Sequence, residues 1–217
     1  MTSNAEDFEN IFVFVPNLIG YCRIIMAIIS FYFMPTNYTI AIVCYVISAL
    51  LDAFDGYAAR YFNQSTKFGA MLDQLTDRCG TMGLTIVLAH LYPKYMFLFL
   101  LSISIDISSH WLYLHSTVVQ GKKSHKFIDM SENPIMNIYY TNKIVLFVMC
   151  AGNESFFIAL YLLYFAPTVI GFKIVLYVTA PIMLAKTFIS LLHCTVAAKN
   201  LAIVDVNERK EMFKKAE

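Results

Sequence analysis

Two pairs of aspartates stand in otherwise apolar sequence, Asp52 with Asp55 and Asp73 with Asp77. The members of each pair are three or four residues apart, so on a helix they would project from one face. Carboxylates inside a membrane are costly and usually functional. Four carboxylates without histidine or cysteine at ligand spacing suit a hard divalent cation, Mg²⁺ or Mn²⁺, which prefers oxygen ligands. The pattern therefore predicts a site for two ions, which would hold the attacking and leaving oxygens of a phosphoryl transfer.

Small residues and one arginine accompany these pairs. Gly56, Ala59 and Gly69 are small enough for two membrane helices to approach closely, and for the phosphates of a ligand to reach the backbone and the ions. Arg60 follows Gly56 by about one helical turn and could offer its planar guanidinium to a phosphate. The alternative interpretation is a set of helix-end charges around a tight turn, which would need no ligand.

The fixed residues spell the pattern D-x2-D-G-x2-A-R-x8-G-x3-D-x3-D over residues 52–77. This pattern resembles the signature of the CDP-alcohol phosphatidyltransferase family at every fixed position. Further stretches, among them PNLIGYCRI at 16–24, SSHWLYLHS at 108–116 and IYYTNK at 138–143, are similar to the eukaryotic phosphatidylinositol synthases within that family. The resemblance implies an enzyme of the endoplasmic reticulum membrane that transfers the phosphatidyl group from CDP-diacylglycerol to myo-inositol and releases CMP.

The same resemblance implies roles for individual residues. Asp52, Asp55 and Asp73 would ligate the divalent ions, and Asp77 would both ligate an ion and act as the general base. The residues that hold the CDP-diacylglycerol head group would be Gly56, Arg60 and Thr66. A hydroxyl of inositol would attack the phosphorus that carries the diacylglycerol while a carboxylate takes its proton. The expected partners are CDP-diacylglycerol, myo-inositol, the lipid bilayer and a second copy of the chain, with no nucleic acid.

The composition places this chemistry in a membrane protein. Of the 217 residues, 59% are hydrophobic and 14% are charged, and the mean hydropathy is +0.61. A soluble domain of this size carries far more charged surface. We therefore expect one all-α integral membrane domain over residues 1–217. The five cysteines lie scattered in apolar segments without metal or disulfide spacing, which is typical of buried free thiols.

Apolar stretches long enough to cross about 30 Å of hydrocarbon predict a bundle of six transmembrane helices. Their predicted ranges are 17–34, 39–60, 68–90, 95–119, 143–165 and 168–198. Lysines and arginines concentrate after the second and fourth spans and in the C-terminal tail, 199–217. Because positive residues favour the cytosolic side, both termini and the acidic cluster are predicted to face the cytosol. The tail is predicted to be a solvated amphipathic helix.

Polar residues outside the signature are candidates for substrate contacts. Asp106 and His110 share a helical face in the fourth span, and they could bind inositol hydroxyls or form a satisfied polar pair between spans. Arg23, about one turn inside the first span, could reach a substrate phosphate or extend to the interface. Asn17 could cap that helix or line the nucleotide pocket. The linker 120–142 could cover the acceptor site or bind anionic head groups through its lysines.

Two other functions fit part of the sequence. A sister transferase could join the same CDP-lipid to glycerol phosphate or serine, because the signature reads only the CDP and the metals. The small number of basic residues in spans four to six favours a neutral acceptor over a phosphorylated one. A cation transporter lined by carboxylates would explain aspartates within the membrane, but it would leave the run Gly56-x2-Ala59-Arg60 unexplained.

Overall fold

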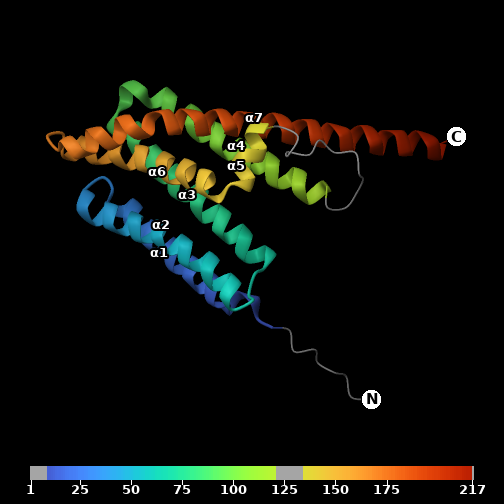
Figure 1. Cartoon of the computed structure of the whole chain (residues 1–217), viewed down its shortest axis with the longest axis horizontal. Helices are drawn as coiled ribbons and strands as arrows, with labels where there is room; N and C mark the ends of the chain where they lie inside the picture. The colour runs from blue at the N-terminus through green and yellow to red at the C-terminus, as the bar shows by residue number, and fades with distance from the viewer. Residues whose placement is uncertain (1–8, 121–133, 217) are drawn as a thin grey trace, which may run out of the picture. The chain divides into compact units, whose positions relative to one another are not determined.

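The structure is a computed structural model that describes residues 9–120 and 134–216 (Figure 1). All regular elements within these ranges are helices, so the predicted all-α class is confirmed. The chain divides into two compact units, Met1–Val87 and Leu88–Glu217.

From residue 9 onward, the first unit contains one short 3-10 helix and three α-helices, the last of which ends just beyond the unit. They are η1 (Ile11–Val13), α1 (Val15–Phe33), α2 (Tyr38–Tyr61) and α3 (Lys67–Leu91). α1 packs along α2, and two serines fasten this contact. Ser30 Oγ donates to the carbonyl of Ala41 at 2.8 Å, and Ser48 Oγ donates to the carbonyl of Arg23 at 3.0 Å. Both hydroxyls thereby find acceptors in apolar surroundings, where an unpaired polar group is costly.

The turn at residues 62–66 joins α2 to α3 and is shaped by local chemistry. Asn63 adopts a φ of 54°, a left-handed conformation that asparagine tolerates better than most residues. Thr66 then caps α3, because its hydroxyl accepts from the backbone N–H of Gly69 at 3.0 Å. The turn thus brings the two helices that carry the acidic pairs into immediate succession.

The second unit contains a short 3-10 helix followed by four α-helices within the described residues. They are η2 (Pro93–Tyr95), α4 (Met96–Gln120), α5 (Pro134–Thr141), α6 (Lys143–Phe165) and α7 (Ile170–Ala216). α7 packs against both α4 and α6, as Figure 1 shows. Tyr113 of α4 stacks on His193 of α7 with ring centroids 4.7 Å apart. Tyr92 donates its hydroxyl to the carbonyl of Leu160 in α6 at 3.0 Å.

Within residues 9–120 and 134–216, five helical segments are long and apolar enough to cross a membrane: α1, α2, η2 with α4, α6 and α7. Apart from α5 and the C-terminal end of α7, the α-helices begin and end within two residues of the predicted spans. α3 forms over the predicted range 68–90 but does not belong to this apolar group. Its first half carries Asp73, Asp77 and Arg78, which lower its hydropathy. The sixth crossing and the cytosolic termini therefore stay predictions.

The C-terminal region differs from the expectation. The tail is helical, as predicted, but it is continuous with the predicted span 168–198, because a single helix, α7, runs from Ile170 to Ala216. Pro181 lies inside this helix without ending it, and neither glycine nor proline occurs where the predicted span ends. With 47 residues at 1.5 Å each, α7 is about 70 Å long, more than twice the thickness of the hydrocarbon layer.

The linker 120–142 is partly helical. Its residues 134–141 form α5, which the sequence did not predict. Asn142 then caps α6, since its side-chain oxygen accepts from the N–H groups of Ile144 and Val145 at 3.0 and 3.2 Å. Residues 121–133, with the lysines expected to bind head groups, lie outside the described residues. The proposed roles of the linker stay predictions.

Candidate active site

Four carboxylates from two helices converge on Arg23 of α1. Asp52 and Asp55 lie on the C-terminal half of α2, and Asp73 and Asp77 lie on the N-terminal half of α3. Nη1 of Arg23 is 2.6 Å from Asp55 Oδ2 and 2.6 Å from Asp73 Oδ1. Nη2 is 2.6 Å from Asp52 Oδ1 and 2.5 Å from Asp77 Oδ1. The two acidic pairs therefore meet, as their spacing predicted.

Arg23 is buried at the centre of this cluster, with 2% of its surface exposed. The prediction that it extends to the membrane interface is therefore wrong. A buried guanidinium is stable only when anions surround it, and the four carboxylates supply them. Its remaining nitrogen, Nε, is buried and has no hydrogen-bond partner among the described residues. Contact between Arg23 and a substrate phosphate stays a prediction.

The cluster also has the chemistry of a metal site. Asp52, Asp55 and Asp73 each offer one oxygen, and the three oxygens lie within 4.8 Å of one another. Such an oxygen-only set fits Mg²⁺ or Mn²⁺. Asp77 joins the cluster through Arg23, and Nη2 of Arg78 lies 3.9 Å from its second oxygen. The residues thus fit a divalent ion, while the number of ions and the base role of Asp77 stay predictions.

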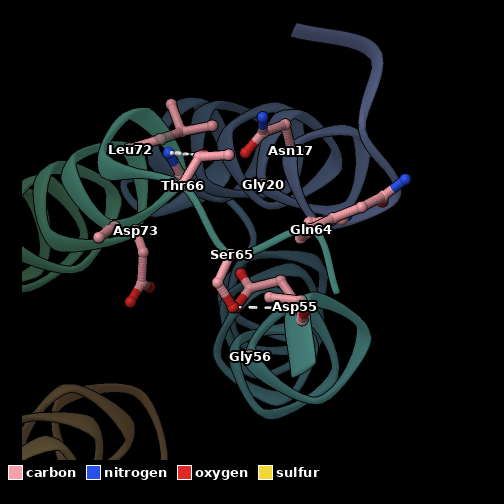
Figure 2. A pocket seen from close by; sticks show the side chains of 13 residues that line it. Asn17, Gly20, Asp55, Gly56, Gln64, Ser65, Thr66, Leu72 and Asp73 are labelled. Atoms are coloured by element: carbon pink, nitrogen blue, oxygen red, sulfur yellow. Dashed lines mark hydrogen bonds between the residues drawn. The ribbon is translucent and has the colours of Figure 1, made fainter. Parts of the chain in front are cut away.

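A pocket opens beside the carboxylates, between α1, α2, α3 and the turn that joins the last two (Figure 2). Asp55 and Asp73 lie on its wall. Two of the three predicted head-group contacts, Gly56 and Thr66, line it as well. Arg60 is exposed and lies next to Gly56, its Nη1 3.5 Å from where a Cβ on that glycine would be. It is not part of the pocket lining within the described residues.

Two further residues of the pocket come from the start of α1 and from the turn. Asn17 is 1% exposed, and its Nδ2 donates to the carbonyl of Ile11 at 2.6 Å. It lines the pocket, whereas the N-cap of α1 is Phe14, so the capping prediction is wrong. Gln64 also lines the pocket, and its Oε1 accepts from the N–H of Val15 at 3.0 Å. The sequence did not single out Gln64, although it lies inside the signature.

The glycine at position 69 is required by close packing in this pocket. A Cβ there would lie 2.9 Å from Asn17 Oδ1 and 3.2 Å from Thr66 Oγ1. Gly69→Ala is therefore expected to lower stability by about 1–3 kcal/mol, the usual cost of overpacking. The measurement is the melting temperature in detergent. Gly171→Ala is the matched control, because nothing lies within 4 Å of its Cβ position, and equal melting temperatures for the two variants would contradict the prediction.

The sequence profile of the CDP-alcohol phosphatidyltransferase family matches residues 13–151. The chain belongs to the CDP-alcohol phosphatidyltransferase family. The matched range contains Arg23, the four aspartates and every residue of the pocket.

Several relatives of this phosphatidyltransferase carry the name CDP-diacylglycerol–inositol 3-phosphatidyltransferase. One from Drosophila melanogaster is 55% identical over 216 residues, which cover 97% of this chain and 95% of the relative. One from Homo sapiens is 57% identical over 206 residues, which cover 93% of this chain and 97% of the relative. One from Schizosaccharomyces pombe is 41% identical over 231 residues, which cover 97% and 98%. No solved structure matches the chain significantly.

The phosphatidyltransferase has a second polar group on α4, in the second unit. His110 Nδ1 lies 3.5 Å from Asp106 Oδ1 and 2.7 Å from the backbone carbonyl of the same residue. The predicted shared helical face is therefore present. Ser109 Oγ lies 3.3 Å from His110 Nδ1 and is fully buried. The part of these residues in binding inositol stays a prediction.

Proposed function

We propose that this chain transfers the phosphatidyl group from CDP-diacylglycerol to myo-inositol and releases phosphatidylinositol and CMP. This proposal rests on two relatives that are 55% and 57% identical over at least 93% of the chain. Both are named CDP-diacylglycerol–inositol 3-phosphatidyltransferase. Family membership accounts for the CDP-lipid donor. The carboxylate cluster beside a pocket supports phosphoryl transfer, and the family match favours a transferase over a cation transporter.

The proposed reaction is one displacement at phosphorus. An inositol hydroxyl oxygen forms a bond to the phosphorus that carries the diacylglycerol, and the bond from that phosphorus to the CMP oxygen breaks. Asp77 takes the hydroxyl proton, a transfer that typically contributes about 10²–10⁴-fold to the rate. Asp52, Asp55 and Asp73, together with Asp77, would hold two ions, Mg²⁺ or Mn²⁺, which would stabilise charge on the phosphate oxygens and on the departing CMP.

The remaining signature residues place the donor. Thr66 is fixed by its hydrogen bond from the Gly69 N–H, so its hydroxyl has a set position on the pocket wall. Gly56, on α2, has no side chain and so leaves space in the pocket for the head group. Arg60 is long and exposed beside Gly56, so its fork can bind a phosphate from the rim of the pocket.

The setting of the reaction is part of the proposal. The distribution of lysine and arginine supports a multi-pass protein with both termini and the acidic cluster towards the cytosol, and the family resemblance supports the endoplasmic reticulum membrane. This orientation would let a water-soluble nucleotide and a lipid tail meet at one site. We also propose a homodimer, which cross-linking in membranes would test.

An assay with several acceptors tests the function. Purified protein is supplied with CDP-diacylglycerol, Mn²⁺ or Mg²⁺, and labelled myo-inositol, serine or glycerol phosphate. Only myo-inositol is expected to enter lipid, with an equal amount of CMP, and EDTA is expected to stop both. Incorporation of serine or glycerol phosphate instead would identify a sister transferase. Failure of every alcohol with folded protein would remove the transferase proposal.

The acceptor contacts can be tested separately on α4. If Asp106 and His110 bind inositol hydroxyls, then Asp106→Asn and His110→Ala should each raise the KM for inositol by about tenfold, the cost of one lost polar contact. The KM for CDP-diacylglycerol should stay unchanged. Ser104→Ala is the matched control, since Ser104 is exposed on the same helix and donates to the carbonyl of Leu100. An unchanged inositol KM in both variants would leave the pair with a structural role only.

A further inference from the structure

Arg23 contacts the carboxylate oxygens that would ligate a metal ion in the proposed site. Its two terminal nitrogens contact one oxygen from each of the four aspartates at 2.5–2.6 Å. Three of these aspartates, Asp52, Asp55 and Asp73, form the group able to hold a metal ion. A guanidinium and a divalent ion would therefore compete for the same carboxylates. This step rests on the proposed function, because it takes the cluster to be a metal site.

The net charge of the cluster differs between the metal-free protein and the protein with bound divalent ions. Four ionised carboxylates carry −4, Arg23 supplies +1, and Arg78, whose Nη2 lies 3.9 Å from Asp77, supplies another +1, so the cluster keeps −2 when it holds no metal. Without Arg23 the charge would be −3 on four carboxylates that lie close together, where like charges repel. With two divalent ions present, the carboxylates are neutralised without Arg23, and the guanidinium then adds repulsion to the ions. The Arg23 side chain thus stabilises the metal-free cluster and disfavours the binding of divalent ions.

The hydrogen bonding of Arg23 points the same way. Its Nε is buried without a hydrogen-bond partner among the described residues, and a buried donor left unpaired is costly. The guanidinium is therefore held here by its two terminal nitrogens alone. Its backbone is fixed separately, because the Arg23 carbonyl accepts from Ser48 Oγ on α2 at 3.0 Å. Displacement of the guanidinium would therefore leave this backbone contact between α1 and α2 intact.

We propose that Arg23 acts as an internal counter-ion, which neutralises part of the acidic cluster in the metal-free protein. Divalent ions displace its guanidinium when they bind. The cluster is then never left with four unpaired carboxylates in the bilayer. The affinity for metal is set by this exchange as well as by the ligands.

The first test measures Mn²⁺ affinity in detergent, from the electron paramagnetic resonance signal of free Mn²⁺. Arg23→Gln is expected to bind Mn²⁺ about tenfold or more tightly than wild type, within the usual range of coupling between two ligands. In EDTA the same variant should melt at a lower temperature than wild type, and saturating Mn²⁺ should narrow that difference. Arg209→Gln, which removes an exposed arginine of α7, is the matched control and should change neither property.

A second test uses the wild-type protein, so it does not depend on the folding of the variant. The chain has four arginines, Arg23, Arg60, Arg78 and Arg209, and ¹⁵N labelling of arginine gives few side-chain signals. Mg²⁺ should change the Arg23 Nε signal and speed rotation of its guanidinium, as the contacts with carboxylates are lost. Assignment follows from single replacements of the other three arginines.

The outcomes separate this inference from the proposed function. Equal or weaker Mn²⁺ binding by Arg23→Gln, or an Arg23 signal unchanged by saturating Mg²⁺, would overturn the counter-ion role while lipid synthesis by wild type continues. If wild type binds no Mn²⁺ and makes no lipid with any alcohol, the proposed function and the inference fail together.

Discussion

Replacing Asp55 by asparagine is expected to lower the rate of phosphatidyl transfer by about 10³-fold or more, because charge stabilisation by bound ions is worth several kcal/mol. Asp55 has the least exposed of the four carboxylate side chains, at 10%, and belongs to the group able to hold a metal ion. Asparagine keeps the size and one oxygen but removes the charge. The measurement is kcat at saturating substrates over a series of Mn²⁺ concentrations.

The control for this prediction is Asp205→Asn, the same change at an exposed position on α7. It should retain wild-type activity. Activity of Asp55→Asn within tenfold of wild type at every Mn²⁺ concentration would mean that this carboxylate does not hold the ions. Its role would then be limited to pairing with Arg23.

Replacing Asp77 by asparagine is expected to lower kcat by about 10²–10⁴-fold, the usual contribution of a general base. Asp77 contacts Arg23 but lies outside the group of three carboxylates able to share an ion. Loss of its charge should therefore affect proton transfer more than metal affinity. The measurement compares kcat at saturating Mn²⁺ with the Mn²⁺ dissociation constant of the same variant.

The comparison with Asp55→Asn decides between two roles for Asp77. A base predicts a slow enzyme that still binds Mn²⁺. If Asp77→Asn instead loses Mn²⁺ binding as fully as Asp55→Asn and regains activity at high Mn²⁺, then Asp77 acts only as a ligand. More than a tenth of the wild-type kcat together with an unchanged Mn²⁺ dissociation constant would exclude both roles.

The meeting of the acidic pairs could be predicted because it depends on local periodicity. Asp52 and Asp55 share one face of α2, Asp73 and Asp77 share one face of α3, and the turn at 62–66 joins the two helices directly. The ends of most helices could also be predicted from the sequence, because polar turns interrupt the apolar runs of membrane length. α5 escaped prediction because its eight residues are too few to form an apolar run of membrane length or to show a helical period.

The place of Arg23 could not be predicted, since it depends on tertiary packing. An arginine near the end of a span has two outcomes, extension to the interface or burial with carboxylates. The rotation of α1 about its axis decides between them, and only the packing of α1 against α2 and α3 fixes that rotation. The same packing turned Asn17 into the pocket and brought Gln64 against the start of α1.

Gly69, Asp73 and Asp77 follow one another at intervals of four residues, so they form a single stripe along α3. The stripe meets α1 along its length, with the glycine against Asn17 and both carboxylates on Arg23. Each residue added to a helix turns those after it by about 100°. One residue inserted after Gly69 would swing both carboxylates off α1 while the composition hardly changed. The spacings between the signature residues therefore determine which face of α3 carries the two carboxylates.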